Sequence, residues 1–102
     1  MFQKDLIVLH KAKEDLVLGK AFYDSIEPGA GSYFVNSLLS DLESLKFLAG
    51  VHKKVFGYYQ ALSKRFPFGV YYDIEDETVI VLAIIDMRQN PNSIKDRLDS
   101  NN

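Results

Sequence analysis

The sequence contains no cysteine, only three prolines and only two histidines. Without cysteine, neither disulfide bonds nor thiolate metal sites can form, and a reducing cytoplasm is the simplest location to expect. The histidines, His10 and His52, do not have metal-ligand spacing. The Gly29–Gly31 segment lies between two expected helices, whereas a phosphate-binding loop follows a strand. We therefore expect no metal ion and no cofactor.

Long hydrophobic runs are also missing. The first ten residues, MFQKDLIVLH, hold an apolar run that is too short for a signal peptide or a membrane span. The chain has 102 residues, of which 47% are hydrophobic and 25% charged, an ordinary globular composition. It shows no internal repeat or low-complexity segment. We expect one cytoplasmic domain over residues 1–102, without membrane contact.

Acidic residues are absent from the middle of the chain. Residues 44–72 carry five basic side chains and no carboxylate, a net charge of +5. Residues 1–43 carry −3 and residues 73–102 carry −4, so the whole chain carries −2. The middle stretch could form a basic patch that faces phosphates or an acidic partner, or its charges could be scattered over solvated loops. Charge alone leaves both interpretations open.

Hydrophobic periodicity predicts one strand and two helices in the first half of the chain. Residues 5–10 (DLIVLH) read as a short strand, and helical spacing follows from Lys11 to Ile26. Residues 27–32 (EPGAGS) break that helix, with Ser32 as the expected N-cap of the next one. The second helix should end near Gly50. Its apolar stripe contains Phe34, Leu38, Leu42, Leu45 and Leu48.

The second half changes to a period of two, which predicts strands over residues 58–66, 68–75 and 78–87. The last of these is apolar on both faces, as a central strand is. Asp76–Glu77 forms the expected hairpin turn, and residues 92–98 a short final helix. The predicted fold is α+β, in the order β-α-α-β-β-β. A helical hairpin packs on a mostly antiparallel four-stranded sheet.

Several segments carry a family resemblance, in the same order along nearly the whole chain. They are AKEDL (12–16), FYDSIEPGAGSYF (22–34), LESL (42–45), RFPFGVYYDI (65–74) and VIVLAIIDMRQNP (79–91). Together they resemble the RelE/ParE superfamily of toxins from type II toxin–antitoxin (plasmid stabilisation) systems. The resemblance implies a RelE-like fold and neutralisation by a cognate antitoxin protein. It also implies one of two activities: metal-independent mRNA cleavage on the ribosome, or poisoning of DNA gyrase.

Metal-free RNA cleavage needs a base for the 2′-hydroxyl, a proton donor for the 5′-oxygen, and cations around the phosphate. The resemblance places Arg65 and Arg88 at phosphate-clamping positions, which suits the planar donor fork of guanidinium. It places Lys53 and Lys54, more loosely, in a segment where RelE-like nucleases carry basic residues. A lysine acts as a base only where burial or a cationic neighbour lowers its pKa. Each of the four is alternatively a solvated surface cation.

Two departures from the family pattern argue against a ribonuclease. Asp86 stands where many members have histidine, and strand alternation puts it on the same face as Arg88, with which it can pair. No tyrosine follows Tyr72, so the C-terminal tyrosine of some ribonuclease members is missing. We therefore keep a non-toxic RelE-fold binding module that has lost catalytic residues as the alternative. A third interpretation is an unrelated α+β binding domain.

The remaining candidate residues are aromatic or imidazole side chains. His52 lies beside the two lysines, and an imidazole titrates near working pH, but a lone loop histidine is usually structural. Tyr58 and Tyr72 are predicted to pack on the helices. Tyr59 and Tyr71 are predicted to face outward beside Arg65, as a surface for RNA stacking or for the antitoxin. If uncovered, such a groove is also a candidate homodimer surface.

Overall fold

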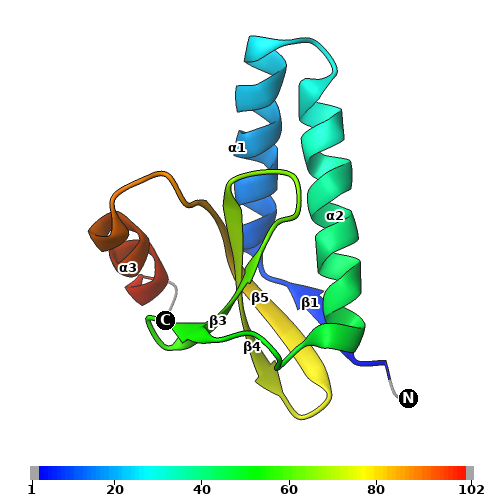
Figure 1. The fold of residues 1–102 in the computed structure, drawn as a ribbon, viewed down its shortest axis with the longest axis vertical. Helices are drawn as coiled ribbons and strands as arrows, with labels where there is room; N and C mark the ends of the chain where they lie inside the picture. The colour runs from blue at the N-terminus through cyan, green and yellow to red at the C-terminus, as the bar shows by residue number, and fades with distance from the viewer. Residues whose placement is uncertain (1–2, 101–102) are drawn as a thin grey trace.

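The computed structural model describes residues 3–100, which form three helices and one five-stranded sheet (Figure 1). The elements are β1 (Asp5–Val8), α1 (His10–Ile26), α2 (Ala30–Leu48), β2 (Lys54–Val55), β3 (Tyr58–Leu62), β4 (Phe68–Glu75), β5 (Thr78–Asp86) and α3 (Pro91–Asp99). This confirms the predicted α+β class and the order of the long elements. The short β2 is the strand that was not predicted. β1 is shorter than predicted because α1 already begins at His10.

The strands lie in the order β1-β5-β4-β3-β2, with β1 parallel to β5 and the other neighbours antiparallel. β5 is an inner strand, as predicted, with the α1–α2 hairpin on one face and α3 on the other. Its apolar residues on both sides are therefore covered. β1 pairs only with Thr78–Val81, so the second half of β5 has an open edge. No helix within residues 3–100 is long and apolar enough to cross a membrane.

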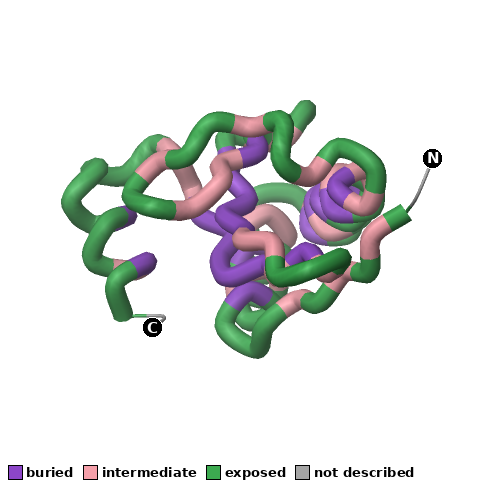
Figure 2. The backbone as a smooth tube through the Cα atoms, turned by 90° about the horizontal axis from the view of Figure 1, so that it is seen from below, coloured by how far each residue is buried: buried purple, intermediate pink, exposed green. Residues whose placement is uncertain are grey.

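The main core lies between the helical hairpin and the sheet, and the outer helix faces remain exposed (Figure 2). The predicted stripe of α2 supplies Phe34, Leu38, Leu42 and Leu45, each at most 2% exposed. Leu48, the last residue of α2, was predicted to join them but is about half exposed. Four aromatic and aliphatic side chains of β4 meet this stripe from the sheet: Phe68, Val70, Tyr72 and Ile74.

A β-bulge in β5 shifts its alternation by one residue. Tyr71 lies opposite Ala83, and the next residue, Tyr72, lies opposite Val81, so the pairing skips one position of β5. Before the bulge, odd-numbered residues of β5 face the helical hairpin. After it, even-numbered residues do, beginning with Ile84. The sequence could not show this shift because β5 is apolar at every position around the bulge.

The predicted N-cap of α2 was wrong. The helix begins at Ala30, because Gly29 adopts the left-handed conformation (φ 93°) and turns the chain between the helices. Ser32 is thereby an exposed residue inside the first turn. The carboxylate of Asp24 in α1 instead accepts a hydrogen bond from the Gly31 N–H at 2.8 Å. The donors Lys20 and Gly31 lower the pKa of Asp24. Gly50 ends α2 as predicted.

β3 ends at Leu62, whereas the sequence predicted a strand that continued to Phe66. The chain turns back because the Phe66 ring packs onto the helical hairpin. Its centroid lies 5.0 Å from that of Tyr23 and 5.1 Å from that of Phe34. Burial of this aromatic ring therefore replaces extension of the edge strand.

The positions of the strand tyrosines differ in part from the prediction. Tyr59 lies opposite Tyr72, and their rings stack 5.1 Å apart on the hairpin side of the sheet, so Tyr59 does not face outward. Tyr58 packs on the α3 side, and Tyr71 is completely buried there. Tyr72 packs on the helical hairpin and Tyr58 on the α3 side, so both lie against helices as predicted, but on opposite faces of the sheet. Alternation orders the residues within each strand but does not say which face of β3 adjoins which face of β4.

Gly19 provides a test of the packing between α1 and α2. A Cβ atom at Gly19 would lie 2.4 Å from the ring of the buried Phe34. We expect Gly19→Ala to lower the free energy of unfolding by about 1–3 kcal/mol, because the ring is confined by the core. Urea denaturation measures the change. Ser32→Ala is the control and should stay within about 0.5 kcal/mol of the wild type. An unchanged Gly19→Ala protein would contradict the close helix contact.

Candidate functional site

Arg65 and Arg88 lie at the same end of the sheet. Arg65 is in the exposed loop between β3 and β4, and Arg88 follows the end of β5. The two segments are joined by a hydrogen bond from the Met87 N–H to the Pro67 carbonyl at 2.7 Å. This end of the molecule therefore brings together two of the four predicted site cations.

The guanidinium of Arg88 is occupied by Asp86. Arg88 Nη2 lies 2.7 Å from Asp86 Oδ2, and Arg88 Nε lies 3.0 Å from Asp86 Oδ1. The Arg88 N–H also donates to Asp86 Oδ1 at 2.9 Å. These contacts lower the pKa of Asp86 and raise the pKa of Arg88. The ion pair that the sequence allowed is thus formed, in the turn after β5, and it uses the Nε–Nη2 edge of the guanidinium.

Lys53 and Lys54 lie elsewhere. Lys54 is opposite Tyr59 in the β2–β3 ladder, and its Nζ lies 4.9 Å from the centroid of that ring, a cation–π contact. Lys54 is separated from Asp86 by four residues along β4 and by three strand spacings across the sheet. This separation corresponds to roughly 20 Å. The four predicted cations therefore form two separate groups.

His52 is turned toward Tyr72. Its Nδ1 lies 2.6 Å from the Tyr72 hydroxyl, which also accepts a hydrogen bond from the Gly50 N–H at 3.0 Å. Burial lowers the pKa of His52 and raises the pKa of Tyr72. A neutral His52 accepting from the tyrosine hydroxyl satisfies all of these groups. This contact fastens the segment after α2 to the sheet.

Tyr71 lies in a buried polar network under α3. Its hydroxyl accepts from Gln60 Nε2 at 2.8 Å and donates to Met87 Sδ at 3.1 Å. Burial raises the pKa of Tyr71. The α3 side chains Ile94 and Leu98 cover this cluster. Tyr71 is thus unavailable to a partner in this conformation, contrary to the predicted role.

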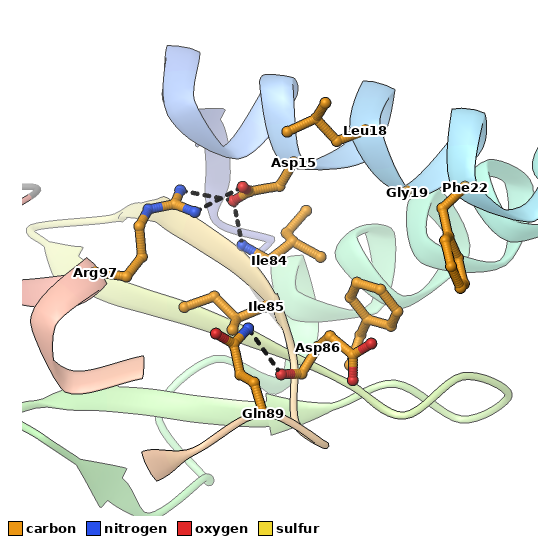
Figure 3. Close-up of a pocket in the computed structure, with 10 residues that line it drawn as sticks. Asp15, Leu18, Gly19, Phe22, Ile84, Ile85, Asp86, Gln89 and Arg97 are labelled. Atoms are coloured by element: carbon orange, nitrogen blue, oxygen red, sulfur yellow. Dashed lines mark hydrogen bonds and ion pairs between the residues drawn. The ribbon is translucent and has the colours of Figure 1, made fainter. Parts of the chain in front are cut away.

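A groove that the sequence did not reveal lies between α1, the end of β5 and α3 (Figure 3). We call it the β5 groove. Its volume is about 340 Å³. It has apolar walls and a polar rim. The walls are Leu18, Gly19, Phe22, Phe68, Ile84 and Ile85, and the rim is Asp15, Asp86, Gln89 and Arg97.

The rim of the β5 groove is built around Asp15. Its carboxylate accepts from Arg97 Nη1 and Nη2 at 2.7 and 2.8 Å, and from the Ile84 N–H at 2.9 Å (Figure 3). The side chain of Asp15 is only 10% exposed. Asp15 therefore ties α1 to both β5 and α3. Sequence reasoning missed it because Asp15 and Arg97 are 82 positions apart.

The helical hairpin packed on a sheet with one parallel edge strand defines a RelE-like α+β fold. Among solved structures, the chain superposes on a chain of the chromosomal ParDE toxin–antitoxin (TA) system from P. aeruginosa with a TM-score of 0.76. The match covers 84% of this chain and 98% of that chain at 20% sequence identity. At this identity the likeness establishes the fold. The sequence matches no protein-family model and no curated protein.

The two aspartates of the groove rim should differ in their effect on stability. We expect Asp15→Ala to lower the free energy of unfolding by about 2–4 kcal/mol, because it removes a mostly buried ion pair and the acceptor for a strand N–H. We expect Asp86→Ala to cost less than about 1 kcal/mol, because its ion pair is solvated. Urea denaturation of both variants makes the comparison. Equal losses would show that Asp15 has no special role.

The partly buried imidazole of His52 should make stability depend on pH. Burial lowers the pKa of His52 from the ordinary value of 6.5, so the unfolded chain takes up the proton first. The stabilising contribution is present above that value and is lost as the pH falls below it. Between about pH 8 and pH 5, the wild type should therefore lose more stability than His52→Gln. His10→Gln, at a side chain 85% exposed, is the control and should follow the wild type.

Proposed function

We propose that this chain is the toxin of a type II toxin–antitoxin module, acting in the cytoplasm by binding a protein target without cutting RNA. Its fold, which is that of a chain from the ParDE system, supports the toxin assignment. The observation that carries the second part is the ion pair of Asp86 with Arg88, because the carboxylate takes the Nε–Nη2 edge of the guanidinium and offsets its charge at the position where the resemblance implies a phosphate clamp.

The surrounding residues do not supply the missing parts of a nuclease. Phosphoester cleavage needs a base, an acid and cations within hydrogen-bond reach of one phosphate. Lys53 and Lys54 lie roughly 20 Å from Asp86 across the sheet. His52 is engaged by a buried tyrosine hydroxyl, and Tyr71 is covered by α3. A nuclease mechanism would require this end of the molecule to be rebuilt.

A gyrase poison, the other activity implied by the resemblance, needs a binding surface and no acid–base pair. The exposed part of α1 offers one, because four large apolar side chains lie there, two of which also form walls of the β5 groove. They are Val17, Leu18, Phe22 and Ile26. Contiguous exposed apolar residues mark protein contacts more often than substrate sites. DNA gyrase is therefore the target class that we favour over the ribosome and mRNA.

The same exposed surface requires a partner in the resting cell. A cognate antitoxin protein that covers it would block target binding and shield the apolar residues from solvent. A homodimer that uses such a surface stays a prediction. The alternative is a non-toxic binding module with the same geometry, and a growth assay distinguishes it from a toxin.

The test is induction of the protein alone in a bacterial host. We expect growth arrest with gyrase-linked DNA breaks and intact mRNA, reversed by co-expression of the product of an adjacent small open reading frame. Arg65→Ala and Arg88→Ala should arrest growth as strongly as the wild type, because neither residue acts on RNA. Primer extension, DNA-break mapping and growth curves come from the same cultures.

Two outcomes would contradict the proposal. Messenger RNA cut at codon positions, with the cuts lost in Arg88→Ala, would identify a ribonuclease. Normal growth with abundant soluble protein would favour the non-toxic binding module in that host. Circular dichroism of the purified variants shows that each one is folded.

A further inference from the structure

The open half of β5 carries backbone groups that the fold does not use. In the first half, the Leu9 N–H donates to the Val81 carbonyl, which continues the parallel ladder with β1. The bulge then shifts the alternation. The backbone groups of Ile84 and Asp86 therefore point away from β4 and into the β5 groove.

Ile84 and Asp86 each present one N–H and one carbonyl on this edge. Side chains satisfy two of these four groups. Asp15 accepts from the Ile84 N–H at 2.9 Å, and Gln89 Nε2 donates to the Asp86 carbonyl at 3.1 Å (Figure 3). The Ile84 carbonyl and the Asp86 N–H make no hydrogen bond within residues 3–100. They lie two residues apart on the wall of an apolar groove. In a parallel ladder, one residue of the neighbouring strand donates its N–H to such a carbonyl and accepts from an N–H two residues further on.

We propose that the β5 groove binds an extended peptide segment of a partner protein, added to β5 in the parallel direction and in line with β1. One residue of the segment donates its N–H to the Ile84 carbonyl and accepts from the Asp86 N–H. This inference rests on the backbone of β5 and on the side chains that line the groove. It holds whether or not the chain is a toxin.

The register of the added strand follows from the existing one. Opposing residues in the β1–β5 ladder share a face, as Leu6 and Val79 do in the main core. The bonded residue is opposite Ile85, so its side chain points toward α3. The residue before it is opposite Ile84 and points toward Leu18 and Phe22. We therefore expect an apolar residue there.

Asp15 limits the length of the added strand. Its carboxylate takes the position that a carbonyl of the incoming strand would occupy at the Ile84 N–H. The segment must therefore enter beside Asp15 and pair over only a few residues. Gln89 is exposed and can turn away from the Asp86 carbonyl, which extends the ladder by one further hydrogen bond.

The test begins with selection of random heptapeptides displayed on phage against the wild-type protein. The enriched peptides are then synthesised and their binding is measured by fluorescence anisotropy. We expect Leu18→Arg, at a wall residue 69% exposed, to weaken binding at least about tenfold. Val51→Arg, at a residue 74% exposed outside the groove, is the matched control and should bind like the wild type.

Two further measurements address the backbone contact. Methylation of the peptide nitrogens, one at a time, should abolish binding mainly at the residue that donates to the Ile84 carbonyl. Hydrogen exchange followed by NMR should show that the Asp86 amide exchanges at least about tenfold more slowly when the peptide is bound. The Gln89 backbone amide, outside the ladder, should change little.

Three results would overturn the inference. The first is that no peptide is enriched. The second is that the selected peptides bind Leu18→Arg as well as the wild type, or tolerate methylation at every nitrogen. The third is that the Asp86 amide becomes protected in concentrated protein without peptide, which would assign the groove to a second copy of this chain.

Discussion

The carboxylate of Asp15 joins three parts of the molecule that are distant in sequence. It accepts two hydrogen bonds from Arg97 in α3 and one from the Ile84 N–H at the open edge of β5. A carboxylate that is mostly withdrawn from water is stable only when such donors replace its hydration. Because all three donors converge on it, the position of α1 over β5 and the docking of α3 depend on the same group. The β5 groove exists in the space that this arrangement leaves.

A second carboxylate, Asp86, decides what the nearby cations can do. It holds Arg88 in a bidentate pair on the solvent side of the groove, whereas Arg65 stays free of carboxylates in its loop within the described part of the chain. The carboxylate takes the Nε–Nη2 edge of the guanidinium and offsets its charge, which weakens the attraction of Arg88 for a phosphate. The RelE-like framework is therefore combined here with an arginine whose charge is offset by a neighbouring carboxylate at the end of β5.

Much of the fold could be predicted because it follows from local patterns. The stripe from Phe34 to Leu45 predicted α2, and the alternation from Phe68 to Ile74 predicted β4 and its buried face. The prediction failed where a distant contact outweighed the local pattern. Ser32 was predicted to be the N-cap of α2, but the helix begins at Ala30, directly after Gly29. The end of β3 was misplaced because Phe66 packs on the helical hairpin.

The sequence by itself determined the α+β class and the order of the long elements, and it placed Asp86 within reach of Arg88, since each depends on residues close together in the chain. Only the tertiary structure decided that Lys53 and Lys54 lie far from that pair, that Tyr71 is buried beneath α3, and that Asp15 meets Arg97. The physical reason is register. Periodicity says which residues share a face of one element, but strand order, the bulge in β5 and helix packing set which faces meet.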